Sequence, residues 1–168
     1  ANAFYLAQLP IKLQDNSPDY AALTLVEKIL GGGTESRLMA RLRQKEGLSY
    51  GVGSQFAASS LEESAVFTLY AMYAPENLTK LKIGIKEELE RFVGHGISEQ
   101  ELADAKKSMM QERENGRAQD ANLAGAHIGN FKANRSFTRA AELDTQIQSV
   151  TLAQANAVIK KYIMPSKF

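Results

Sequence analysis

The sequence has 168 residues, of which 44% are hydrophobic and 23% charged, values that suit one globular domain. Lys and Arg number 20 and Asp and Glu 19, so a net charge of +1 gives no overall attraction to nucleic acid or to an anionic membrane. No apolar run approaches the roughly 18 residues of a membrane span. The absence of cysteine excludes disulfides and thiolate zinc sites.

The chain starts with a strand pattern and continues into a helix. Residues 3–13 alternate with a period of two, and Pro10, which lacks an amide donor, places this strand at a sheet edge, a bulge or near the strand end. Ser17 and Pro18 predict a helix start, as N-cap and first helical residue. The apolar stripe of that helix is broad, which indicates a well-buried helix ending at Gly31.

Residues 31–56 are the stretch on which the functional argument depends. Three glycines, Gly31–Gly33, end the first helix, and Thr34 is placed to cap a second. Gly47 ends this second helix, and a strand is expected from Leu48. The apolar stripe of the second helix consists of Leu38, Met39 and Leu42.

A sharp reversal at Glu46-Gly47 brings Arg43, in the last helical turn, beside Tyr50, just inside the following strand. The residues alone allow a simpler interpretation. An arginine near a helix C-terminus favours the macrodipole, and a tyrosine in an apolar strand often belongs to the core. Alternation places Tyr50 on the same strand face as Val52, and only its position at the corner frees its hydroxyl from the core.

The strand from Leu48 and the run 65–74 most simply form an antiparallel hairpin across a polar turn. The second strand is apolar on both faces, which favours a central place in the sheet. Gly51 and Gly53 share one strand face and leave room for another backbone. Three interpretations are open: the approaching backbone belongs to a bound peptide, it belongs to a closely packed helix, or the glycines mark a bulge in the strand.

Helical patterns fill the rest of the chain and predict an α+β fold: a small, largely antiparallel sheet with helices on one face and a helix-rich C-terminal part. Capping boxes are expected at Ser98 with Glu101 and at Thr151 with Gln154. In the helix at 118–131 the residues spaced for packing are Leu123, His127, Ile128 and Phe131.

The ordered string Gly31-Gly32-Gly33, Ser36-Arg37-Leu38, Leu42-Arg43 and Gly47-Leu48-Ser49-Tyr50 resembles the second, non-catalytic domain of the pitrilysin/insulinase-type zinc peptidases, the inverted zincins. The resemblance extends from about Tyr5 to Phe168. It implies that residues 1–168 are a single non-catalytic peptidase-family domain, truncated at both ends.

The resemblance also implies roles for the corner. In this family an arginine and a tyrosine seven residues later face the peptide substrate, which corresponds to Arg43 and Tyr50. Arg43 would bond a substrate carbonyl through its planar donors, and Tyr50 would donate its hydroxyl near the scissile bond, as a transition-state donor.

Zinc is expected on another half, in the same parent chain or in a separate subunit, and this chain alone is expected to be inactive. The inverted zincins bind zinc through H-x-x-E-H and a distant glutamate, and neither His95 nor His127 lies in such a motif. We therefore expect no metal ligand and no catalytic residue here, with His95 in an exposed loop and His127 partly buried. The glycine run lacks the lysine and Ser/Thr of a phosphate-binding loop, which disfavours nucleotide binding.

Two other functions remain open at this point. The first is a structural subunit related to the respiratory-complex core proteins, without peptidase activity. The second is a stand-alone peptide-binding module. The Arg43 and Tyr50 spacing favours an active zinc metalloendopeptidase with a peptide substrate. Bacterial members of the resembled family with this kind of motif are often periplasmic, so the resemblance suggests the periplasm, with the cytoplasm as the alternative.

Overall fold

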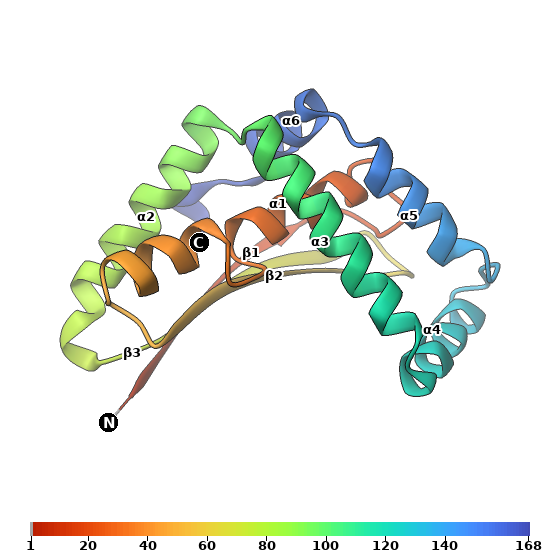
Figure 1. Ribbon diagram of the computed structural model, residues 1–168, viewed down its shortest axis with the longest axis horizontal. Coiled ribbons are helices and arrows are strands. Elements are labelled where there is room, and N and C mark those ends of the chain that lie inside the picture. The colour runs from red at the N-terminus through yellow and green to blue at the C-terminus, as the bar shows by residue number, and fades with distance from the viewer. Residues whose placement is uncertain (1) are drawn as a thin grey trace.

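The computed structural model describes residues 2–168, in which a curved three-stranded sheet is covered by helices on one face (Figure 1). The strand order is β1 (Ala3–Ile11), β3 (Ala65–Tyr73), β2 (Gly51–Ala58), and both pairings are antiparallel. The predicted fold class is confirmed.

Alternation along the strands divides the sheet into a buried and an open face. Leu9 and Ile11 of β1 and Phe67 and Leu69 of β3 point into the core beneath the helices. β3 is central, as its apolar character on both faces predicted. β1 is an edge strand, which explains how it accommodates Pro10.

Helix α1 lies at the centre of the helical layer, where it contacts α3, α5, α6 and β2. Its residues Leu23, Leu25, Val26 and Leu30 are fully buried, which confirms the broad stripe. The capping boxes at Ser98 and Thr151 are both present. The helical segments are α1 (Tyr20–Leu30), the π-helix η1 (Met39–Lys45), η2 (Pro75–Asn77), α2 (Leu78–His95), α3 (Glu99–Arg117), α4 (Asp120–Lys132), α5 (Arg139–Ser149), α6 (Leu152–Tyr162) and η3 (Pro165–Lys167).

Helix α4 departs from expectation, because none of its side chains is buried. Phe131 is 86% exposed, and His127 is exposed rather than partly buried, its ring edge-on to Phe137 at 4.9 Å. The packing prediction is wrong for this chain because α4 lies at the far end of the molecule, beyond the sheet (Figure 1).

The α4–α5 connection is fastened to the turn after β1 instead. Arg135 donates to Asp15 through both of its terminal nitrogens, one at 2.7 Å, and to the Ser60 carbonyl at 3.2 Å. Arg139 donates to the Asp15 carbonyl at 2.6 Å. These contacts fix the base of α4 while its outer surface stays open.

Candidate functional site

The corner between η1 and β2 is built by an unusual helix end. The Glu46 amide donates to the Arg41 carbonyl at 2.9 Å, a bond across five residues, and Gly47, at a φ of +61°, reverses the chain. β2 begins at Gly51, so the expected start at Leu48 is wrong. Tyr50 precedes the strand, yet its amide already donates to the Met72 carbonyl at 2.8 Å.

The start of the helical segment also differs from expectation. Thr34 does not cap it, because helical geometry begins only at Arg37. The Thr34 carbonyl instead accepts from the Gln44 side chain at 3.2 Å, and the Ser36 hydroxyl donates to the Gly33 carbonyl at 2.6 Å. The glycine segment therefore forms an irregular connection before η1.

Two arginines of this segment hold it against the rest of the protein. Arg37 donates to both carboxylate oxygens of Glu101, at 2.6 and 2.9 Å, and this contact draws the pKa of Glu101 down to about 2. Arg41 donates to Glu46 at 2.8 Å and also binds Glu87 on α2. The side chains of Arg37 and Arg41 therefore both have structural partners within the domain.

Arg43 is different, since its guanidinium has no carboxylate within 4.0 Å among residues 2–168 and donates to the Met39 sulfur at 4.0 Å. Its side chain is exposed. The Tyr50 side chain is 58% exposed, because it leaves the chain one residue before β2 and escapes the face that buries Val52. The structure thus presents both predicted residues at one corner, with no bond between them.

The glycine segment has a packing role that its sequence did not specify. The Ser54 amide of β2 donates to the Gly31 carbonyl at 3.1 Å, and a Cβ on Gly31 would lie 2.4 Å from that amide nitrogen. A Cβ on Gly53 would lie 2.9 Å from the same carbonyl and 2.7 Å from the Tyr70 hydroxyl. The backbone that approaches β2 here is therefore the end of α1. At Gly51 the space is open, with Met72 Cε the nearest atom at 4.0 Å.

A partly buried carboxyl beneath this contact was missed in the sequence. Glu27 of α1 accepts a hydrogen bond from the Ser54 hydroxyl at 3.1 Å, and burial raises its pKa from 4.5 to about 7. The available signal was its position, four residues after Leu23 and three before Leu30, both of which are fully buried.

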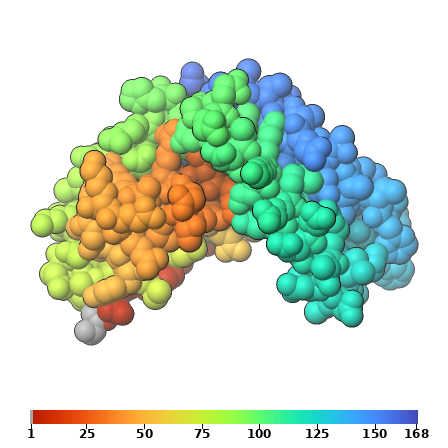
Figure 2. Space-filling model, in the orientation of Figure 1, coloured from red at the N-terminus to blue at the C-terminus, as the bar shows by residue number. Residues whose placement is uncertain are grey.

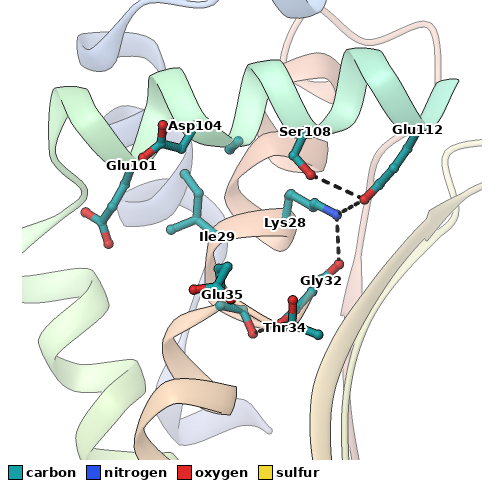
Figure 3. Close-up of a pocket in the computed structure, with 12 residues that line it drawn as sticks. Lys28, Ile29, Gly32, Thr34, Glu35, Glu101, Asp104, Ser108 and Glu112 are labelled. Atoms are coloured by element: carbon teal, nitrogen blue, oxygen red, sulfur yellow. Dashed lines mark hydrogen bonds and ion pairs between the residues drawn. The ribbon is translucent and has the colours of Figure 1, made fainter. Parts of the chain in front are cut away.

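The cavity beside the glycine segment has a volume of about 510 Å³ and lies between this segment and α3 (Figure 3). Lys28 donates to the Gly32 carbonyl at 3.1 Å and pairs with Glu112 at 2.5 Å. Apart from Lys28 and Glu112, the ionisable residues that line the cavity are Glu35, Glu101 and Asp104. All three are acidic, which disfavours phosphate binding. Neither Arg43 nor Tyr50 lines this cavity.

Across residues 2–168, no group of three or more His, Cys, Asp or Glu side chains is arranged to hold a metal ion. His95 is exposed, as expected, but it is the last residue of α2 rather than a loop residue. Over the same residues, every helix is too short or too polar to cross a membrane.

Comparison with known proteins points to one family. The family model described as the peptidase M16 inactive domain matches residues 2–109, which include β1, the glycine segment and the corner. The non-peptidase homologue YmxG of Helicobacter pylori is 29% identical over 161 residues, covering 95% of this chain and 37% of that protein. An uncharacterised zinc protease of Mycobacterium leprae is 33% identical over 138 residues, covering 82% of this chain and 30% of that protein.

Solved structures agree with this assignment. The peptidase M16 inactive domain from Pseudomonas fluorescens gives a TM-score of 0.83 at 26% identity, over 99% of this chain and 40% of that chain. A chain of complex III2 from Candida albicans gives a TM-score of 0.78 at 15% identity, over 95% of this chain and 40% of that one, a likeness of fold alone. The chain spans less than two-fifths of the length of the Helicobacter pylori and Mycobacterium leprae relatives. Since the family model covers well over half of its residues, the chain belongs to the peptidase M16 inactive-domain family.

Proposed function

We propose that this chain is the non-catalytic, substrate-contacting domain of a zinc metalloendopeptidase, closing the chamber opposite the zinc site. Zinc and the general base belong to another half, in the same parent chain or in a separate subunit, and the substrate is a peptide. The observation that carries the proposal is the exposed pair Arg43 and Tyr50 on a fixed corner. A relative described as a zinc protease supports it.

The corner provides two donors suited to a peptide backbone. The Arg43 guanidinium is free to donate to a substrate carbonyl, because among residues 2–168 it forms no ion pair and its hydrogen-bond partner is the Met39 sulfur. The Tyr50 hydroxyl donates to the carbonyl, and then to the oxyanion, near the scissile bond. A preorganised donor of this kind is worth about 2.7–4 kcal/mol in the transition state. The bond from the Tyr50 amide to Met72 limits movement of the tyrosine backbone.

Substitution at the corner tests these roles in the assembled peptidase. We expect Tyr50→Phe to lower kcat by about 10²-fold or more, because only the hydroxyl donor is lost. Arg43→Ala should lower kcat/KM for every peptide, since it removes a contact to the substrate backbone. Fluorogenic peptide hydrolysis measures both effects, and thermal unfolding confirms that the fold is retained.

Lys45→Ala is the matched control, because Lys45 is an exposed cation of the same segment. Its activity should equal that of the unmodified protein. Full activity in both Arg43→Ala and Tyr50→Phe, with the fold intact, would refute the proposed roles.

The second candidate is a structural subunit without peptidase activity. It is favoured by the description of the Helicobacter pylori relative as a non-peptidase homologue and by the fold shared with complex III2. The two functions differ in one measurement. A purified assembly that contains this chain cleaves peptides in a zinc-dependent manner if the first is correct, and cleaves none if the second is.

A further inference from the structure

The open face of the sheet carries large apolar side chains at the end nearest Tyr50. Helices cover the opposite face (Figure 1), and the arched molecule is hollowed along the side away from them (Figure 2). Phe4 is 60% exposed and Met72 49% exposed, and Leu6 and Tyr70 are exposed on the same face. We call these four residues, Phe4, Leu6, Tyr70 and Met72, the apolar face.

Strand register joins the apolar face directly to the corner. Met72 lies opposite Phe4 on one side and opposite Gly51 on the other, and its carbonyl accepts from the Tyr50 amide. In the next row Tyr70 lies opposite Leu6, and the Phe4 and Tyr70 rings stack with centroids 6.5 Å apart. The apolar face therefore lies directly beside Tyr50, one of the two proposed donors.

The strands that carry this face contain no charged residue. Ala3–Ile11, Gly51–Ala58 and Ala65–Tyr73 are made only of apolar and neutral polar residues, although one face of each is open to solvent. Open faces of antiparallel sheets normally alternate apolar-in with polar-out. A face that is apolar and uncharged on the outside is suited to an uncharged, apolar occupant.

Gly51 leaves a gap in this face beside Tyr50. Its position has only Met72 Cε at 4.0 Å, whereas Gly53 in the next row is covered by the Tyr70 ring. The result is an area of bare strand backbone bordered by the Met72 side chain. Such an area accepts the side chain of a bound molecule without displacing anything in this chain.

We propose that the apolar face and the Gly51 gap receive a large apolar side chain of the peptide substrate, close to the residue whose carbonyl Arg43 and Tyr50 bind. The substrates would then be peptides with an aromatic or long aliphatic residue near the cleaved bond. This inference rests on the proposed function, and it adds the chemical class of the substrate. Burial of that side chain against Met72 supplies the selectivity.

The test is cleavage of matched peptides by the assembled peptidase. Each set of three peptides differs at one position, which holds Phe, Ala or Asp. Separate sets place this variable position at successive residues on either side of the cleaved bond. At one position we expect the unmodified protein to favour Phe over Ala by about tenfold or more. Met72→Ala should remove most of this preference, and Gly51→Val, which fills the gap, should slow the Phe peptide more than the Ala peptide and so lower the ratio of their rates.

The control is Leu61→Ala, which removes an exposed leucine from the β2–β3 turn at the other end of the sheet. It should leave the preference intact. Equal losses for all peptides in Met72→Ala and Gly51→Val, or no preference for Phe in the unmodified protein, would overturn the inference. So would loss of assembly in Met72→Ala, measured by size-exclusion chromatography, because the face would then be a subunit contact.

The two proposals fail in different ways. If Arg43→Ala and Tyr50→Phe slow all peptides alike but no Phe preference exists, the donor roles stand and the apolar inference falls. If neither substitution affects cleavage, the donor roles fall whatever the preference. An assembly that cleaves no peptide overturns both.

Discussion

Replacing Gly31 by alanine should destabilise the protein by about 3 kcal/mol. The new Cβ would lie 2.4 Å from the Ser54 amide nitrogen and 2.8 Å from the Gly53 carbonyl carbon, and both are backbone atoms that cannot move aside cheaply. Overpacking costs about 1–3 kcal/mol, and separating the strands loses the bond from Ser54 to Gly31, worth about 1 kcal/mol. Thermal unfolding should show a fall in Tm of about 6–12 °C.

Gly33→Ala is the matched control for this substitution. A Cβ there would meet only the end of the flexible Lys28 side chain, with Nζ at 3.3 Å. Its Tm should stay the same or rise slightly, because alanine restricts the unfolded chain by about 0.4–1 kcal/mol. If both variants unfold at the same temperature, the contact between Gly31 and β2 does not hold the end of α1 in place.

Glu27→Gln should stabilise the protein at pH 8 by about 3.5 kcal/mol and have little effect at pH 4. Burial raises the pKa of Glu27 from 4.5 to about 7 in the folded protein. Below pH 4.5 Glu27 is protonated in both the folded and the unfolded protein, so its burial does not lower the stability through ionisation. Between 4.5 and 7 the unfolded chain ionises while the folded one retains its proton, so stability falls as pH rises. Above 7 the full penalty remains, about 1.4 kcal/mol per unit of pKa.

Chemical denaturation at several pH values measures this effect. The unmodified protein should lose stability between pH 4.5 and 7 relative to Glu27→Gln, whose amide still accepts from the Ser54 hydroxyl. Glu35→Gln, an exposed carboxyl beside the same cavity, should change stability by about 0.5 kcal/mol at most. A constant difference between Glu27→Gln and the unmodified protein at all pH values would contradict the assignment of a buried, proton-retaining carboxyl.

Local patterns in the sequence were sufficient for the sheet and for the chain reversal at Gly47, but not for the start of β2. Alternation from Tyr5 to Leu13 specified the inner face of β1, and the doubly apolar run 65–74 specified the central strand. The seven-residue spacing of Arg43 and Tyr50 across a glycine reversal placed both at one corner, and the structure exposes both. Each of these features depends on residues close in sequence, so periodicity was enough to predict it.

The features that could not be predicted depend on distant partners. Glu27 is partly buried, and its hydrogen-bond partner Ser54 belongs to a strand 27 residues later. The start of β2 moves to Gly51 because the chain reverses at Gly47 and the Leu48 amide still donates to the Leu42 carbonyl of η1, at 2.8 Å. The stripe on α4 has helical spacing, yet spacing alone does not say whether a partner lies in the same chain.

The two edges of the sheet differ in a way that limits how copies of this chain can associate. The Gly31 carbonyl occupies the outer edge of β2, whereas in the part of the chain that the structure describes β1 pairs with β3 alone. Free strand edges without charged residues are templates for pairing with another chain. Antiparallel pairing of β1 with its own copy would form a two-fold symmetric dimer, in which each β1 edge covers the other and neither is left to add a further chain.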